Sequence, residues 1–292
     1  MPDKKQITHL RRSIRRKATR VIAVTSGKGG VGKTNVAANL SVALSRSGCD
    51  VMLFDADMGL ANVDVLLGLQ PRFNLAHVVS GEADLDCTIV PGPAGIRIVP
   101  ASSGDRSLLD LPQCAQAAIV RSFGDIATPP DILVVDTAAG LSESVARFTQ
   151  AAHHAVVVVC DEPSSITDAY ALIKLFSRDY GISHFQIVTN MTSTQAEGRR
   201  LFDKINTVSN QFLDVVLRHA GNIPMDPLLR RAVQEQRAVA DVYPRAPAGR
   251  AFADLARLLV SLPSPSQPSG AIEFFLERLI GSDARGVLEA AS

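Results

Sequence analysis

The sequence has few of the features that mark secreted, membrane-spanning or nucleic-acid-binding proteins. Its 292 residues include four cysteines, and no two of them form a Cys-x-x-Cys pair. Isolated cysteines favour reduced thiols over disulfides or metal ligands, and they argue against a metal-cluster carrier. No apolar run reaches the roughly 20 residues of a membrane-spanning helix, and the charged N-terminus lacks a signal peptide's apolar stretch. The formal net charge of +1 gives no case for direct nucleic-acid binding. We therefore expect a cytoplasmic protein.

A glycine-rich loop between an apolar strand and a helix is the strongest motif that the chain does have. Residues 21–25 are a β-branched apolar run that leads directly into the pattern Gly-x-x-x-x-Gly-Lys-Thr. Glycines let backbone N–H groups turn inward around a phosphate, and the helix N-terminus adds its dipole. Lys33 can reach the β- and γ-phosphates and Thr34 can ligate Mg²⁺, roles that a plain strand-to-helix turn leaves unexplained. The residues expected to bind a nucleoside triphosphate here are Gly27, Lys28, Gly29, Gly30, Val31, Gly32, Lys33, Thr34 and Asn35.

Three aspartates stand at the ends of two further apolar strands. Residues 51–54 lead into Asp55 and Asp57, and residues 132–135 lead into Asp136. Extended residues two apart face the same side, so Asp55 and Asp57 can both point at the phosphate loop. Carboxylates there can hold the hydration shell of Mg²⁺ and orient an attacking water. The alternative is a set of solvated aspartates at ordinary strand ends. It is less favoured because the first pair follows a phosphate loop by one helix and one strand.

The end of a later strand offers a side chain for the base. Residues 185–190 form an apolar strand that ends in Asn190, and α/β proteins bind ligands beyond the carboxyl ends of their strands. An asparagine amide has the donor and the acceptor that an adenine edge requires. The segment does not match the Asn-Lys-x-Asp signature of GTP-specific proteins. ATP is therefore expected rather than GTP.

The pattern of strands and helices predicts an α/β fold. All-apolar strands are buried on both faces, which indicates a doubly wound, mostly parallel sheet with helices on both faces. Helices are expected over residues 35–47, 107–123, 228–236 and 248–262, and a further helix is expected to begin at Ser164 or Ser165 with Asp168 completing a capping box. The pair His153-His154 is interpreted as structural. Four segments follow from composition: a basic tail 1–19, an ATPase domain 20–262, a Pro/Ser-rich linker 263–270, and an amphipathic helix with a tail 271–292.

The second lysine of the glycine-rich loop, Lys28, makes the loop resemble the deviant Walker A motif of MinD/ParA ATPases. The resemblance implies an ATP-dependent homodimer in which Lys28 reaches the partner's nucleotide, and it makes Lys28, Lys33 and Asp57 the catalytic residues. Asp57 would activate the attacking water. It implies Mg²⁺ contacts for Thr34, Asp55 and Asp136, the aspartates through water, and further nucleotide contacts for Glu162, Asn190, Pro224 and Asp226.

The order of the motifs along the chain resembles the FlhG/FleN (YlxH-type) group of flagellar MinD-like ATPases. The segment 161–174 and the terminal Glu-Phe-Phe-Leu-Glu-Arg-Leu carry this resemblance. Gln6, Leu10 and Arg11 match part of that group's N-terminal activator motif, whereas Lys5 and Ile7 depart from it. The group implies control of flagellar number and placement, with partners that include an FlhF-type GTPase, flagellar switch components and a FleQ-type transcription activator. The alternatives are a division-site or partition ATPase of the same class, and a nucleotide-binding scaffold with little hydrolysis.

The C-terminal segment predicts a helix tethered by a flexible linker. Its apolar face is formed by Ile272, Phe275, Leu276, Leu279 and Ile280. The resemblance favours reversible attachment to the inner face of the cell membrane, although two glutamates against one arginine give no basic face for anionic lipid. Docking onto its own domain or onto a partner protein is the alternative.

Overall fold

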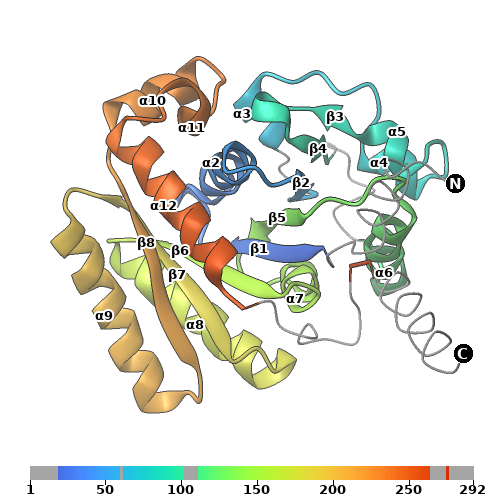
Figure 1. Ribbon diagram of the computed structural model, residues 1–292. Helices are drawn as coiled ribbons and strands as arrows, with labels where there is room; N and C mark the ends of the chain where they lie inside the picture. The colour runs from blue at the N-terminus through green and yellow to red at the C-terminus, as the bar shows by residue number, and fades with distance from the viewer. Residues whose placement is uncertain (1–18, 60–61, 102–110, 264–273, 276–292) are drawn as a thin grey trace, which may run out of the picture.

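The computed structural model describes residues 19–59, 62–101, 111–263 and 274–275 of the chain. These residues form an eight-stranded sheet with the order β3-β4-β2-β5-β1-β6-β7-β8, shown in Figure 1. Its strands are β1 (Arg20–Ser26), β2 (Val51–Ala56), β3 (Val90–Pro91), β4 (Arg97–Val99), β5 (Ile132–Ala139), β6 (His154–Cys160), β7 (His184–Thr192) and β8 (Val216–Pro224). Every neighbouring pair is parallel except β3 and β4. The predicted doubly wound α/β fold is confirmed.

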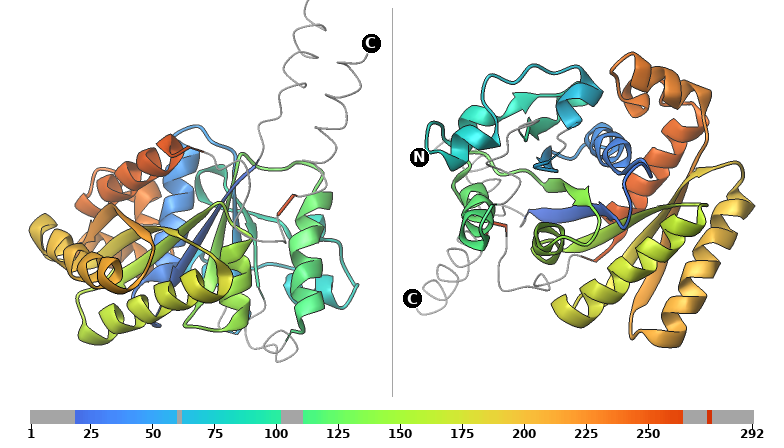
Figure 2. Two further views of the ribbon diagram at one scale, coloured as in Figure 1. Left: turned by 90° about the horizontal axis from the view of Figure 1, so that it is seen from below. Right: turned by 180° about the vertical axis from the view of Figure 1, so that it is seen from behind.

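Helices cover both faces of this sheet. One face carries α2 (Lys33–Arg46), α10 (Pro227–Gln234), α11 (Val239–Val242) and α12 (Pro247–Ser261). The other carries α6 (Gln113–Ser122), α7 (Glu143–Gln150), α8 (Pro163–Tyr180) and α9 (Gln195–Phe212). Figures 1 and 2 show these two layers from three directions. The remaining short helices are α3 (Val63–Leu67), α4 (Leu75–Val79), α5 (Leu85–Thr88), η1 (Pro93–Gly95) and η3 (Phe123–Asp125).

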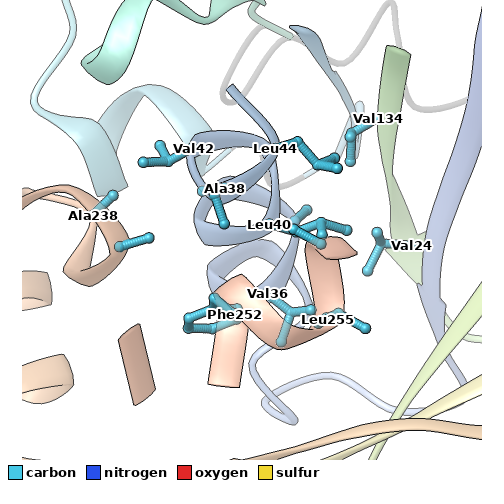
Figure 3. Packing of buried hydrophobic residues seen from close by; sticks show 14 of the residues in the cluster. Val24, Val36, Ala38, Leu40, Val42, Leu44, Val134, Ala238, Phe252 and Leu255 are labelled. Carbon is cyan, nitrogen blue, oxygen red and sulfur yellow. The ribbon is translucent and has the colours of Figure 1, made fainter. Parts of the chain in front are cut away.

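Helix α2 is the central element of one layer, because it packs on both the sheet and α12. Its apolar side chains at Val36, Leu40 and Leu44 are fully buried or nearly so. Figure 3 shows them packed among Val24 and Val134 of the sheet and Phe252 and Leu255 of α12. Burying one such side chain contributes about 1.5–3 kcal/mol. This packing holds the first turn of α2, which follows the glycine-rich loop, in a fixed position against the sheet.

The start of α8 differs from the prediction. The helix begins at Pro163 with Glu162 as its N-cap, and no side chain makes a capping hydrogen bond there. The capping box on Ser164 or Ser165 with Asp168 is therefore wrong. Proline replaces it, because its preset φ suits the first helical position and it lacks an N–H that would need a partner. The Ser165 hydroxyl instead accepts a hydrogen bond from the Cys160 N–H at 3.1 Å, which ties the helix to the end of β6.

Two residues of the C-terminal segment lie on the domain. Phe274 and Phe275 are almost fully buried, and their ring centroids are 5.2 and 6.2 Å from that of Phe123. The Phe123 ring in turn packs against Phe54 of β2 in a tilted arrangement, with the ring centroids 4.9 Å apart, so an aromatic cluster joins the segment to the sheet. The pair is the short red segment beside α6 in Figure 1. Phe274 and Phe275 form a turn, and Phe275 has a positive φ of 65°, so the predicted amphipathic helix does not run through this pair. The basic tail up to residue 18, the linker beyond Pro263 and the remainder of 271–292 lie outside the described residues.

No helix among the described residues is both long and apolar enough to cross a membrane.

Candidate nucleotide-binding site

The glycine-rich loop has the open geometry that a phosphate requires. Gly30 and Gly32 have φ values of 82° and 84°, in the left-handed region where a side chain is strained. A Cβ on Gly27 would lie 2.3 Å from the backbone carbonyl of Asp168, and a Cβ on Gly32 would lie 2.5 Å from the amide nitrogen of Asn190. By contrast, nothing lies within 4 Å of a Cβ built on Gly29 or Gly30. The loop is therefore packed tightly on its protein side and is open where phosphate would lie.

A buried ion pair joins this loop to the end of β5. The Lys33 ammonium donates to Asp136 Oδ1 at 2.7 Å, and both side chains are almost completely buried. The Thr34 side chain lies close enough to Asp136 to lower the pKa of that carboxyl. The other carboxylate oxygen, Asp136 Oδ2, is buried and has no hydrogen-bond partner. Burial raises the pKa of Asp136, and the charge of Lys33 opposes that rise. An unpaired buried oxygen beside Thr34 suits a Mg²⁺-bound water, as the sequence predicted for these two residues.

Asp55 and Asp136 are adjacent because β2 and β5 pair in register at these two positions. Asp55 is buried and accepts hydrogen bonds from the backbone N–H groups of Asp57, Asn62 and Val63 at 3.1–3.2 Å. Burial, together with the neighbouring Asp136, raises the pKa of Asp55 to about 8. Two adjacent buried carboxylates repel each other, so a divalent cation close to them would stabilise both. The residues present therefore fit Mg²⁺.

Mg²⁺ at this position would depend on the nucleotide. The described part of the chain contains no group of three or more His, Cys, Asp or Glu side chains that could hold a metal ion. Mg²⁺ commonly keeps several waters and binds through one or two carboxylates together with substrate phosphates. Thr34, Asp55 and Asp136 match that arrangement, in which water and phosphate complete the coordination.

The raised pKa of Asp55 predicts how stability changes with pH in the absence of nucleotide and Mg²⁺. Folded Asp55 holds its proton up to about pH 8, whereas an unfolded aspartate releases it near ~3.9. The contribution of Asp55 to the free energy of unfolding is complete below the pKa of the unfolded aspartate, and it is lost as the pH rises through 8. His154 has the opposite effect. Burial lowers its pKa to about 4, so its contribution makes the free energy of unfolding rise with pH, but only below about pH 6.5. Between pH 7 and 8, we therefore expect the free energy of unfolding to fall by about 1 kcal/mol.

Urea unfolding in EDTA at pH 7 and pH 8 measures this change. The Asp55→Asn variant has no carboxyl to titrate at this position, so its free energy of unfolding should fall less between pH 7 and pH 8. An equal pH dependence in the variant and the original protein would contradict the assignment to Asp55.

Lys28 does not point freely into solution in the single chain. Its ammonium donates to Glu162 Oε2 at 2.7 Å and to the Ser164 hydroxyl at 2.8 Å. The hydrogen bond to Glu162 raises the pKa of Lys28. Both side chains of the pair are solvent-exposed, at 38% and 57%, and exposed pairs are weak because water and salt screen them. The pair can therefore open at little cost, which a lysine acting on a second subunit requires.

Three further predicted residues have structural contacts. Asn190 donates its side-chain N–H to the Val31 carbonyl at 2.8 Å and so braces the glycine-rich loop. Asp226 accepts hydrogen bonds from Leu228 N–H and Ala248 N–H, both at 2.9 Å, and so caps the starts of α10 and α12. Pro224 pairs with Thr192 at the end of β7. The structure brings Asn190 next to the loop. The roles of Asn190, Pro224 and Asp226 toward the base remain predictions.

One residue beside the loop was not predicted from the sequence. Met191 is 45% exposed, has a positive φ of 57°, and its Cε would lie 3.3 Å from a Cβ on Gly32. An exposed apolar side chain directly after a strand end was the signal that could have identified it. We regard Met191 as a candidate for apolar contact with the base.

A strand, a glycine-rich loop and a helix, with a lysine and a Walker B aspartate at the carboxyl edge of a parallel sheet, define a P-loop nucleotide-binding protein. Residues 22–239 match the CobQ/CobB/MinD/ParA nucleotide binding domain, and the chain belongs to this family.

Curated relatives and solved structures agree with this assignment. The chain is 52% identical over 266 residues to the antiactivator FleN of Pseudomonas aeruginosa, covering 91% of this chain and 95% of FleN. It is 34% identical to the flagellum site-determining protein YlxH of Helicobacter pylori, with 90% of each chain covered. The structure of the cell division ATPase MinD from Pyrococcus furiosus superposes with a TM-score of 0.70 at 26% identity, covering 84% of this chain and 99% of MinD. The chain is therefore a MinD-like ATPase of the FlhG/FleN type.

Proposed function

We propose that the protein is an ATP-dependent dimerisation switch that regulates the number and placement of flagella. The flagellar role is supported by full-length similarity to FleN and YlxH. The observation that best supports a switch between subunits is Lys28, the extra lysine of the loop, which is exposed and held by a weak pair with Glu162. A lysine needed only within its own subunit would be buried beneath the loop, as Lys33 is.

Different residues of the chain have different roles in hydrolysis. The loop N–H groups and Lys33 hold the β- and γ-phosphates, and Lys33 leaves Asp136 to do so. Asp57 orients the attacking water, and Lys28 of each subunit stabilises charge on the partner's nucleotide. Thr34 and, through water, Asp55 and Asp136 would hold Mg²⁺, which would supply positive charge to neutralise the phosphates. Loss of the γ-phosphate removes these contacts, and the dimer then separates. Turnover is slow until a partner protein completes the site.

The partners and location belong to the same proposal. The dimer presents a surface to an FlhF-type GTPase, to flagellar switch components and to a FleQ-type transcription activator. The protein is cytoplasmic and contacts the inner face of the cell membrane reversibly through its C-terminal segment. The buried pair Phe274 and Phe275 supports reversibility, since the same rings that can enter lipid are held by Phe123 in the single chain.

A division-site or partition role is the second candidate, and the likeness to MinD of Pyrococcus furiosus favours it. The two roles share an active site and differ in their partners. Flagella counted by electron microscopy in a deletion strain separate them. A changed number or placement with normal division supports the flagellar role, whereas normal flagella with misplaced septa would exclude it. A turnover assay with and without partners distinguishes the switch from a scaffold that binds nucleotide without hydrolysing it.

Lys28→Ala should retain ATP binding and lose ATP-dependent dimerisation. The phosphate contacts made by Lys33 and the loop remain, whereas the partner's nucleotide loses a charged contact at the centre of the interface. Such contacts contribute about 2 kcal/mol or more, so the dimer dissociation constant should rise at least ~30-fold. Light scattering with a non-hydrolysable ATP analogue measures it.

Arg200→Gln is the matched control, because it removes an exposed positive charge from α9, which packs on β7, β8 and α8. Its dimer should form as in the original protein. A Lys28→Ala variant that dimerises normally would exclude the role of this lysine between subunits.

A further inference from the structure

A pocket of about 320 Å³ lies at the amino ends of β6, β7 and β8, at the opposite edge of the sheet from the nucleotide site. Strand β1 connects the two edges. It begins beside this pocket, where the Val21 N–H donates to His153 Nδ1 at 3.0 Å, and it ends at the glycine-rich loop. Its seven residues span about 20 Å at ~3.3 Å per residue. A ligand in this pocket would therefore not compete with the nucleotide.

The register of the strands explains why polar side chains gather here. Gln186 pairs with Val156 of β6 and with Arg218 of β8, and His184 pairs with Val216. His154 is two residues before Val156, so it points to the same face. Val156 and Val188 on this face pack with α12, but α12 ends at Ser261. Leu262 and Pro263 form a wall of the pocket, and the amino ends of the strands remain uncovered.

Two buried polar atoms in the pocket lack partners. Gln186 is 6% exposed, and its Oε1 is buried without a hydrogen bond. His154 Nε2 is buried and also has no partner. Buried polar atoms in native proteins nearly always have a partner, because an unsatisfied one is costly. Both atoms are enclosed, but they belong to residues that line the pocket. A turn of either side chain would present its atom to a bound species that supplies the missing hydrogen bond.

The charge of the pocket indicates that the bound species is an anion. Arg218 is an exposed lining residue, and no ion pair of its guanidinium is found among the described residues. No aspartate or glutamate lines the pocket. The Arg20 charge is close enough to lower the pKa of both His153 and His154, after the larger effect of burial. The site is therefore positive, with apolar walls at Ile182, Val216 and Leu262. Its volume is at the lower end of the range for small-molecule sites.

We propose that this pocket binds a small organic anion, a carboxylate or a phosphate monoester with an apolar body, independently of the nucleotide. Arg218 and the Gln186 amide N–H group donate to the anionic group, His154 Nε2 gains a polar partner, and the apolar body packs on Val216 and Leu262. A hydrogen-bond donor on the ligand can satisfy Gln186 Oε1.

Histidine-detected NMR tests the site directly, since three histidines line the pocket. Full-length protein, saturated with MgADP so that the loop is occupied, is titrated with benzoate, phenyl phosphate and neutral benzamide. We expect saturable shifts of the His154 and His184 ring signals with at least one of the two anions and at least tenfold weaker binding of benzamide. The two anions together show whether the site prefers carboxylate or phosphate. Arg218→Gln should weaken binding at least ~10-fold, because it removes a charge-assisted hydrogen bond. Arg200→Gln, on α9, should leave it unchanged.

Gln186→Leu separates a binding site from a structural polar group. If the amide serves a ligand, leucine removes an unsatisfied buried atom, so the melting temperature of the ligand-free protein should stay the same or rise while anion binding is lost. Saturable shifts that depend on Arg218, together with an unharmed Gln186→Leu fold, support the proposal. Absence of saturable shifts with both anions, equal binding of benzamide, or unchanged binding in Arg218→Gln would overturn it.

Discussion

Asp57→Ala should lower the rate of ATP hydrolysis by about 100-fold or more while the ATP-bound dimer persists. A positioned proton acceptor contributes ~10²–10⁴-fold to such a step, and the substitution removes the residue proposed for that role. Phosphate binding should remain, because the glycine-rich loop, Lys33 and Asp136 are unchanged. Asp57 is not part of the buried ion pair between Lys33 and Asp136, so that pair stays intact in the variant.

Phosphate release over a time course measures turnover, and light scattering of the same samples follows the dimer. Asp64→Ala is the control, because Asp64 is an acidic residue in the same segment at the start of α3. Among the described residues, its carboxylate accepts a hydrogen bond only from its neighbour Val65 N–H. It should keep turnover close to that of the original protein. Turnover of Asp57→Ala at the original rate would show that another group orients the water.

The sequence was sufficient for the elements of the site because each motif sits at the end of an apolar strand. Parallel strands end at one edge of the sheet, so Asp55, Asp57, Asp136 and Asn190 could be expected near the loop without knowing the strand order. The contacts between them were not predictable. Lys33 and Asp136 are 103 residues apart, and their pairing depends on β5 lying between β1 and β2, an order that no local pattern encodes.

The sequence also could not decide between two roles for residues whose side chains suit both. Asn190 was expected to face a base, and the structure gives its amide N–H to the Val31 carbonyl. Asp226 was expected beside the base, and both of its carboxylate oxygens cap helices. Side-chain amides and carboxylates serve either purpose equally well, so residue type does not decide between them. The lysine at position 28 is similar, since its bond to Glu162 in the single chain requires the fold to bring β1 and α8 together.

The double substitution Phe274→Ser with Phe275→Ser should abolish ATP-dependent binding to lipid vesicles. In the single chain the two rings are buried against Phe123, so nucleotide-free protein should stay in solution. When the ATP dimer forms, the proposal requires the rings to leave this cluster and enter the lipid. Burial of one phenylalanine contributes about 1.5–3 kcal/mol, so loss of both should reduce vesicle binding by more than ~100-fold.

Sedimentation with vesicles of neutral and anionic composition measures this loss, and Phe212→Ser is the matched control. Phe212 is an aromatic residue at the end of α9 that is 58% exposed, so its removal costs little buried area and should leave vesicle binding intact. Neutral and anionic vesicles should bind about equally, because residues 271–280 carry two glutamates and one arginine and so give no electrostatic preference for anionic lipid. If the double variant sediments like the original protein, the two rings serve only to dock the segment on its own domain, and the membrane contact must come from elsewhere in the chain.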